Sequence, residues 1–337
     1  MLSLKKLILT LMICLFSLPV LAKSQTGTVT MEFDLSAHTT GQEVKLWLPY
    51  PISSESQKID QISWHTDSAE TAVYTDSKDG NPILYSRWDE DAKSRKLILK
   101  FRAERAEQTS SKLIDQGIPL DQATFGRYLS ATRLGPIDGP VKALANEITA
   151  GKKGILAKAR AIYDWTVDNS FRDPETRGCG LGNVPQLLER PGGKCADISS
   201  LYVAIARSAG VPAREILGLR LGKEDGTDIT GWQHCWAEFY LPGTGWVAID
   251  PADVRKAMLK QNLNLNDPKV AKLRAYYFGN VDPYRIRLSE GRDLTLNPPQ
   301  VGVEINYLMY PFAQVGGQTI DWLDPTTFKY KITFNQE

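Results

Sequence analysis

The stretch that decides the fold runs from Pro191 to Arg214 and reads PGGKCADISSLYVAIARSAGVPAR. Two glycines precede Cys195, and the residues after it are apolar at positions three and four apart, which predicts a helix with an apolar face. Gly210 and Pro212 are typical of the end of such a helix. The thiol of Cys195 therefore stands at the first helical turn, a position compatible with core filling, metal binding or nucleophilic attack.

The segments on either side of this helix indicate the fold class. Upstream, PVKALANEITA (140–150) and ILAKARAIYDWTVDN (155–169) have helical spacing, and VPQLLER is a shorter helical piece. Downstream, AREILGLRLG, QHCWAEFYL and GWVAIDP are predicted strands, the last two joined by PGTG. A central helix between helices and an antiparallel sheet indicates an α+β domain.

The first third of the chain is predicted to be a separate β-rich unit. TVTMEFDL, EVKLWLPYP, ILYSRW and RKLILKFRAE are short strands, separated by turn-rich segments such as DSKDGN and DEDAKS. This spacing favours a small β-sandwich over residues 23–114, acting as a scaffold or docking part. Residues 115–337 form the second predicted unit, with VEINYLMYPF and TFKYKITF as a C-terminal β extension.

The first 22 residues have the pattern of a secretory signal peptide. Lys5 and Lys6 precede an apolar run of 15 residues, from Leu7 to Leu21, which is shorter than the roughly 20 residues that span a bilayer. Ala22 fits the small-residue cleavage site. We therefore expect a periplasmic or secreted protein without stable membrane insertion after the signal is removed.

Charge is nearly balanced along the chain. The sequence has 40 basic and 39 acidic residues, and removal of 1–22 leaves 38 and 39. This balance argues against nucleic acid or an anionic membrane as the partner. The acidic residues are scattered, without the alternating ligands of a calcium loop. We expect no cofactor and no metal.

Cys195 has the local setting of an activated thiol. The pKa of a cysteine, about 8.5 when free, falls at a helix N-terminus or beside an imidazolium, and the thiolate is the nucleophile. Of the three histidines, His38 and His65 lie in the β-rich part, whereas His234 lies on a predicted strand of the same unit as Cys195. We predict that His234 is the general base and that Asp250, which ends the hairpin partner strand, orients it.

The register of this hairpin decides whether His234 and Asp250 can meet. If Tyr240 lies opposite Trp246, Asp250 is near the diagonal neighbour position of His234, at about 7–8 Å between backbones. A register shifted by one residue places the two side chains on opposite faces. We therefore predict the Tyr240–Trp246 pair, with a five-residue loop over 241–245 or a bulge.

Three sequence blocks together resemble the transglutaminase-like superfamily of cysteine acyl-transfer enzymes. They are GKCAD before an apolar helix, then GVPAR, then HCWAEFYLPGTGWVAIDP, and ARAIYDWTVDNS upstream is similar to the family's lead-in helix. The resemblance covers about 136–251. It implies a papain/transglutaminase-like core, with Cys195 as nucleophile, His234 as general base and Asp250 as the orienting residue, acting on a peptide or protein substrate. The β-rich N-terminal part resembles the sandwich that precedes this core in bacterial members.

One position departs from the family pattern. Members often carry Tyr or Trp after the lead-in helix, where it helps to stabilise the oxyanion, but this chain has Phe171, which cannot donate a hydrogen bond. The backbone N–H of Cys195 remains as a donor. Gln186 and Trp232 are candidates for the second donor.

The remaining cysteines leave alternatives open. Cys179 and Cys235 are compatible with a disulfide that leaves Cys195 free, or Cys179 pairs reversibly with Cys195. A zinc site is disfavoured, because the adjacent His234 and Cys235 point to opposite faces of a strand. For the same reason Cys235 is not expected to be catalytic. Asp197 is interpreted as a helix-start residue rather than a catalytic acid.

The chemistry implied is attack of Cys195 on an amide carbonyl to give a thioester. Water then gives hydrolysis, as in a protease or amidase, and an amine gives a protein cross-link. We favour hydrolysis. A non-catalytic binding module that keeps the fold is the alternative of another class.

Overall fold

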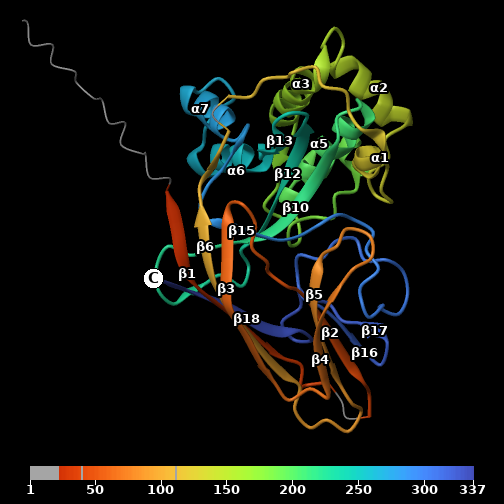
Figure 1. Ribbon diagram of the computed structural model, residues 1–337, viewed down its shortest axis with the longest axis vertical. Helices are drawn as coiled ribbons and strands as arrows, with labels where there is room; N and C mark the ends of the chain where they lie inside the picture. Colours follow the sequence, from red (N-terminus) through yellow and green to blue (C-terminus); the bar gives the residue numbers. More distant parts are fainter. Residues whose placement is uncertain (1–22, 39–40, 111) are drawn as a thin grey trace, which may run out of the picture.

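The computed structural model describes residues 23–38, 41–110 and 112–337, so the predicted signal peptide, 1–22, lies outside the described residues. Figure 1 shows a helix-rich half above a half built from strands. In the described residues, no helix combines the length and the apolar character needed to cross a bilayer.

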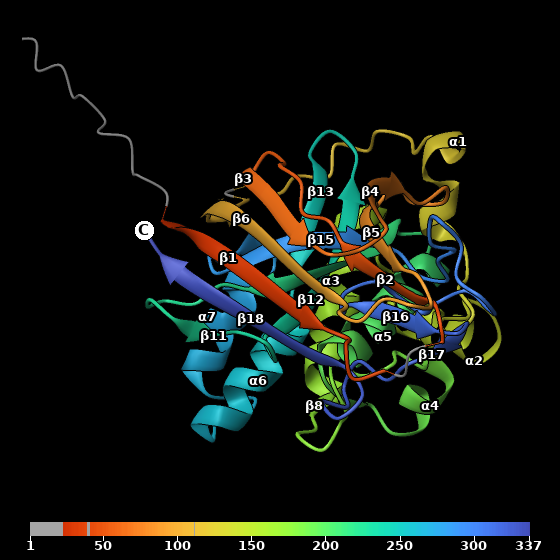
Figure 2. The ribbon, with the colours of Figure 1, turned by 90° about the horizontal axis from the view of Figure 1, so that it is seen from below.

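Two antiparallel sheets make up the strand-built half. The first has the order β11 (Thr227–Asp228), β18 (Lys329–Gln336), β1 (Ser24–Asp34), β6 (Lys96–Ala106) and β3 (Gln57–Thr66), and Figure 2 shows the last four side by side. The second has the order β17 (Gln318–Thr319), β16 (Phe312–Val315), β2 (Val44–Pro49), β5 (Pro82–Trp88) and β4 (Glu70–Thr75).

Alternating burial explains why these strands pack as a sandwich. Every second residue of β1 and β6 is buried, so each strand presents one apolar face. Val29 and Leu99 of the first sheet share a core with Leu46 and Trp88 of the second. The β-rich N-terminal region expected from the sequence is confirmed.

The C-terminal strands complete this sandwich. β18 pairs with β1 from Gly27 to Asp34, and β16 pairs with β2. Leu219 and Ile286, from the helix-rich half, also enter the sandwich core. The C-terminal β extension, assigned from the sequence to 115–337, is therefore paired with the N-terminal strands. Alternation shows that a segment is a strand with one buried face, but not which sheet receives it.

The helix-rich half is built on a four-stranded antiparallel sheet. Its order is β13 (Gly245–Ile249), β12 (Gln233–Leu241), β10 (Ala213–Arg220) and β15 (Arg285–Glu290). The helices are α1 (Gln122–Phe125), a 3-10 turn (Gly126–Leu129), α2 (Gly139–Ile148), α3 (Gly154–Asn169), α4 (Val184–Glu189), α5 (Cys195–Ser208), α6 (Pro251–Gln261) and α7 (Pro268–Tyr276). Two short pairs, β7 (Gln108–Thr109) with β14 (Asn280–Val281) and β8 (Phe171–Arg172) with β9 (Gly192–Gly193), complete the fold.

Helix α5 is the centre of this half. It packs on β12 and β10, while α2, α3, α4 and α6 contact its other sides, and of its 14 residues only Arg207 is not buried. An amphipathic helix with one apolar face was expected, whereas the structure encloses it almost completely. The α+β class with a central helix on an antiparallel sheet is confirmed.

Some element predictions were wrong or incomplete. VEINYLMYPF was expected to be a strand, but β16 begins only at Phe312, and the preceding residues form an irregular segment with one bridge from Ile305 to Leu294. The apolar pattern there arises because Leu308 and Met309 are buried without ladder pairing. The strands β3, β4 and β15 and the helices α6 and α7 were also not predicted from the sequence.

Candidate active site

The glycines before Cys195 bring another segment against the start of α5. β9 pairs with β8 in parallel, and a Cβ placed on Gly192 would lie 2.1 Å from the ring of Phe171. The guanidinium of Arg190 lies 5.0 Å from the centre of the same ring. Phe171 therefore covers the glycine turn, which is a packing role that a phenyl ring fulfils.

Asp197 closes the first turn of α5, as the sequence predicted. Its carboxylate accepts hydrogen bonds from the backbone N–H of Gly182 at 2.9 Å and of Lys194 at 3.0 Å. Burial raises the pKa of this carboxyl. Gly180, with φ of +91°, approaches so closely that a Cβ there would lie 1.8 Å from a carboxylate oxygen. The glycine-rich loop is thus fastened to the helix that begins with Cys195.

The hairpin has the predicted register. Tyr240 pairs with Trp246, and the ladder extends one step further to Leu241 and Gly245. The expected five-residue loop is therefore a three-residue connection over 242–244. The tighter turn forms because Gly243 and Gly245 adopt positive φ, which glycine tolerates without a Cβ penalty.

His234 and Asp250 meet as this register requires. The Nε2 atom of His234 lies 2.8 Å from Oδ2 of Asp250, and both residues are buried. Asp250 is the N-cap of α6, and its Oδ1 atom accepts the backbone N–H of Asp253 at 2.9 Å. The helix start thus holds one carboxylate oxygen while the other faces the imidazole.

Cys195 lies beside the same imidazole and beside two further thiols. The neighbouring thiols of Cys179 and Cys235 are the largest influence on the pKa of Cys195, and the imidazole of His234 adds to them. Together they outweigh burial and hold the pKa of Cys195 well below its usual range. Cys195 and His234 line one cleft, and His234 contacts Asp250.

Cys179 and Cys235 are free thiols, not a disulfide. The neighbouring Cys195, and then burial, raise the pKa of Cys179 well above its usual value, and burial does the same for Cys235. The Cys179 thiol also lies 3.4 Å from the carbonyl oxygen of Gln233 and accepts the Tyr310 hydroxyl at 3.2 Å. Both neighbouring thiols therefore favour their protonated form beside Cys195, an effect that was not predicted from the sequence.

Arg285 is a site residue that the sequence did not reveal. It is buried on β15 and hydrogen-bonds the carboxylates of Asp250 and Asp282, and that of Asp253 at 2.8 Å. Its Nη1 atom is also 2.9 Å from Nε2 of His234. Burial lowers the pKa of Arg285, but the three carboxylates outweigh it and raise this pKa well above its usual value.

The cluster of His234, Asp250 and Asp253 has residue types that can bind a metal, and it is the one such group among the described residues. The guanidinium of Arg285 hydrogen-bonds both carboxylates and approaches the imidazole. Its positive charge occupies the place that a cation would need. We therefore assign no metal to this cluster.

A cleft of about 830 Å³ opens in front of Cys195 and His234. Its basic lining residues are Arg172, Lys194, Arg220, Lys223, Lys256 and Lys260. Its aromatic lining residues are Trp232, Tyr310, Trp322, Phe328 and Tyr330. The helix-rich half supplies all the cations, and the C-terminal segment of the sandwich supplies all the aromatic rings except Trp232. Aspartate and glutamate are missing from the described lining of this cleft.

The two candidates for a second oxyanion donor lie in different places. Trp232 lines the cleft and is 40% exposed. Gln186 lines a neighbouring hollow with Asp197 and is not part of the described lining of the cleft in front of Cys195. The geometry therefore removes Gln186 from consideration and keeps Trp232.

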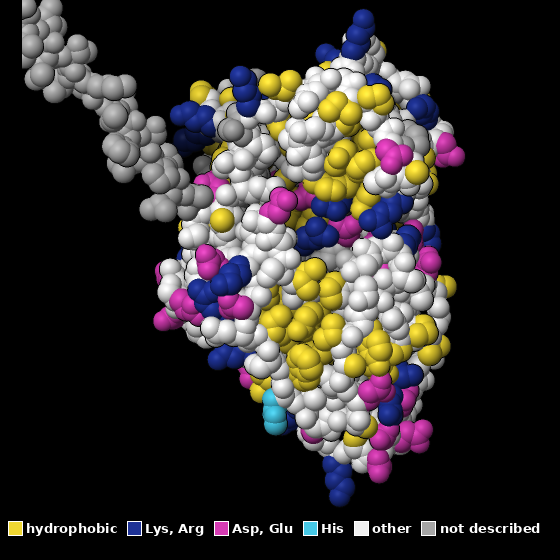
Figure 3. Space-filling model, in the orientation of Figure 1, with side chains coloured by type: hydrophobic (Ala, Val, Ile, Leu, Met, Phe, Trp, Pro, Cys, Tyr) yellow, Lys and Arg dark blue, Asp and Glu magenta, His cyan; other side chains and the backbone are white. Residues whose placement is uncertain are grey.

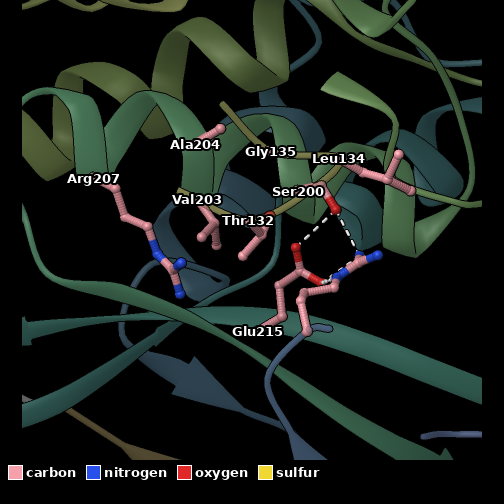
Figure 4. Close-up of a pocket in the computed structure, with 10 residues that line it drawn as sticks. Thr132, Leu134, Gly135, Ser200, Val203, Ala204, Arg207 and Glu215 are labelled. Carbon is pink, nitrogen blue, oxygen red and sulfur yellow. Dashed lines mark hydrogen bonds and ion pairs between the residues drawn. The ribbon is translucent and has the colours of Figure 1, made fainter. Parts of the chain in front are cut away.

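A second buried cluster lies on the other side of α5. Figure 4 shows Ser200 and Glu215 pointing toward each other, 2.7 Å apart, and Arg292 bonds both of them. The cavity beside them has a volume of about 20 Å³. That volume fits a single water rather than a substrate, so this cluster fixes the position of α5.

Comparison with known proteins agrees with this geometry. A model of the transglutaminase-like superfamily matches residues 142–251. An uncharacterized protein of Haemophilus influenzae is 34% identical over 327 residues, covering 89% of each chain. A protein-glutamine gamma-glutamyltransferase of Pseudomonas aeruginosa is 29% identical over 87 residues, covering 24% of this chain and 13% of that one.

Among solved structures, a candidate cysteine protease of Cytophaga hutchinsonii superposes with a TM-score of 0.55 at 15% identity, covering 93% of this chain and 99% of that one. At this identity the likeness concerns the fold alone. Together with the sequence match over α2 to the start of α6, it leads to one conclusion: this chain belongs to the transglutaminase-like superfamily.

Proposed function

We propose that this protein is an exported cysteine acyl-transfer enzyme that hydrolyses peptide or carboxamide bonds through a thioester on Cys195. The observation that carries the proposal is the placement of Cys195 at a helix start, in one cleft with His234, whose Nε2 atom lies 2.8 Å from Oδ2 of Asp250. This is the arrangement of a nucleophile, a base and an orienting carboxylate.

The proposed reaction has two balanced steps. The thiolate of Cys195 attacks the carbonyl carbon, the C–S bond forms, and the C–N bond breaks as His234 gives its proton to the leaving nitrogen. Water then gives a proton to His234 and attacks the thioester, and the C–S bond breaks to release a carboxylate. The backbone N–H of Cys195, at the positive end of α5, is the proposed donor to the oxyanion.

Hydrolysis is favoured over cross-linking by the charge of the cleft. A lysine side chain acting as acyl acceptor carries a positive charge at neutral pH. It would approach a cleft lined by six basic residues, whereas water meets no such repulsion. Export to the periplasm or the outside is part of the proposal and rests on the signal pattern of residues 1–22.

Selective alkylation tests the activated thiol. Iodoacetamide should modify Cys195 well below pH 8.5, with the modified residue identified by peptide mass spectrometry. His234→Ala should slow this reaction at least about tenfold because the thiolate loses its partner. His65→Ala, outside the site, serves as the matched control. Equal, slow labelling with and without His234 would instead identify a binding module that keeps the fold.

A second measurement separates the two fates of the thioester. A peptide mixture is incubated with the protein, with and without an added primary amine, and the products are weighed by mass spectrometry. We expect cleaved or deamidated peptides in both samples and none in the Cys195→Ala variant. Products that carry the amine in preference to water would assign the protein to cross-linking.

A further inference from the structure

Most of the basic side chains that line the cleft have no acidic side chain as a partner among the described residues. Arg220 is paired, with Nη2 at 2.6 and 2.5 Å from the two carboxylate oxygens of Asp253. The other five basic lining residues have no salt bridge within the part of the chain that the structure describes: Arg172, Lys194, Lys223, Lys256 and Lys260. Elsewhere, basic and acidic side chains are intermixed, as on the face shown in Figure 3.

These cations reach the cleft from separate elements. Arg172 ends β8, Lys194 directly precedes Cys195, and Lys223 follows β10. Lys256 and Lys260 are four residues apart on α6, so they lie on one face of that helix. Four segments thus place the same sign of charge around one thiol.

This arrangement costs stability in the free protein. Burial and the charges of Arg220, Lys260 and Arg172 lower the pKa of Lys256, with Asp253 as its opposing neighbour. Like charges in a cleft with low-dielectric walls repel one another and focus their field outward. A chain with nearly equal numbers of basic and acidic residues has the acids to neutralise such a site, so the unpaired cations indicate an anionic ligand.

We propose that the cleft selects polypeptide segments whose carboxylates flank the amide attacked by Cys195. This inference rests on the proposed function, because it takes Cys195 as the reacting atom. The aromatic wall of the cleft supplies the apolar surface for the peptide backbone and side chains, and the cations select the charge. Net charge steers such a substrate to the site as well as holding it.

The positions of Lys256 and Lys260 limit where the carboxylates of the substrate can lie along the peptide. A helix rises about 1.5 Å per residue, so Lys256 and Lys260 are roughly 9 and 15 Å along α6 from its N-cap, Asp250. An extended peptide advances about 3.3 Å per residue. The carboxylates that meet α6 are therefore expected within about five residues of the attacked amide.

Two alkylating reagents that differ by a carboxylate measure the field at the thiol. Iodoacetate transfers a carboxymethyl group and iodoacetamide a carbamoylmethyl group to sulfur, each with release of iodide, but only iodoacetate is an anion. The ratio of their rates at Cys195 should fall about two- to fivefold in Lys256→Gln/Lys260→Gln, and less at high salt. Lys269→Gln/Lys272→Gln, on the exposed surface of α7 outside the cleft, is the matched control and should leave the ratio unchanged.

Three peptides then test whether the cleft recognises acidic side chains or a terminal carboxylate. An acetylated and amidated peptide with aspartates around a central amide should protect Cys195 from iodoacetamide more strongly than its asparagine counterpart. A third peptide, neutral except for a free terminal carboxylate, distinguishes a chain end from acidic side chains. Protection by either carboxylate peptide, lost in Lys256→Gln/Lys260→Gln, supports the proposal and identifies which source is recognised.

The possible failures are distinguishable. If the rate ratio is the same in all variants and the three peptides protect equally, while labelling still depends on His234, the anionic substrate is overturned and the proposed enzyme stands. If labelling does not depend on His234, the proposed function falls, and the substrate inference falls with it.

Discussion

Two buried arginines at opposite ends of one strand hold the two halves of the site. Arg285 begins β15 and bonds Asp250, Asp253 and Asp282 beneath His234. Arg292, just after the same strand, bonds one carboxylate, Glu215, and otherwise neutral groups around α5 (Figure 4). One arginine anchors the histidine end and the other the cysteine end.

The difference lies in the charge around each guanidinium. Arg292 has one carboxylate partner, together with Ser200 and the carbonyl oxygen of Leu181 at 2.8 Å. Arg285 faces three carboxylates and the ring of His234, so its removal leaves negative charge next to the imidazole of His234. Similar burial therefore gives a packing role to Arg292 and a positioning role, acting through His234 and Asp250, to Arg285.

The largest expected effect is the loss of either arginine. Arg285→Gln and Arg292→Gln should each lower the free energy of unfolding by about 3–5 kcal/mol, because a buried carboxylate loses its partner. Urea denaturation measures this. Only Arg285→Gln should also shift the pH profile of Cys195 alkylation to higher pH, because it removes a buried positive charge beside the imidazole of His234.

This comparison has a control and a clear contrary result. Arg285→Lys keeps the charge and supplies a folded variant if the glutamine substitution unfolds the chain, although it cannot form the same planar fork. Its pH profile should stay close to that of the unmodified protein. Identical profile changes for Arg285→Gln and Arg292→Gln would contradict the distinction between positioning and packing.

A second substitution sharpens the comparison with a smaller effect. Adding Glu215→Gln to Arg292→Gln removes the uncompensated charge and should restore about 2 kcal/mol. Adding Asp282→Asn to Arg285→Gln should restore less than about 1 kcal/mol, because two carboxylates remain charged. Urea denaturation measures the free energy of unfolding that each second substitution restores. The difference between the two values shows how many carboxylates each arginine neutralises. Equal rescue would mean that Arg285 depends mainly on Asp282.

Local sequence predicted the parts of the site that depend on local geometry. Cys195 is marked by glycines before a helix, and the Tyr240–Trp246 register follows from one short hairpin. Arg285 and the cleft cations were not predicted, because they converge from distant segments and no spacing marks them. The partner of β18 was not predicted either, because alternating buried and exposed residues indicate a strand but not that it pairs with β1.

Some elements were missed although the signals are present. Asp250 followed by Pro251, and Asp267 followed by Pro268, have the N-cap and N1 residues of helices, and both open one, α6 and α7. Asp250 was interpreted only through its expected contact with His234. Its second role, as the cap of α6, explains why the carboxylate is held in place.

Asp79 provides the smallest test, because its arginine neighbour, Arg127, is half-exposed, unlike the buried Arg285 and Arg292. The carboxylate of Asp79 lies against Gly291, which stands between Arg285 and Arg292 in the chain. The Nη1 atom of Arg127 is 3.6 Å from Oδ1 of Asp79. Burial, then the charges of Glu290 and Asp76, raise the pKa of Asp79 to about 6. The native state therefore binds more protons than the unfolded state between about pH 4 and 6, so this residue lowers stability as pH rises through that range.

Asp79→Asn should remove that penalty. We expect the free energy of unfolding to rise by about 1 kcal/mol at pH 7, a figure reduced for the partial exposure of the carboxyl. At pH 4, where Asp79 is protonated in the native state, the gain should disappear. Urea denaturation at the two pH values measures both. An equal gain at pH 4 and pH 7 would show that the charge of Asp79 is not the cause of the gain.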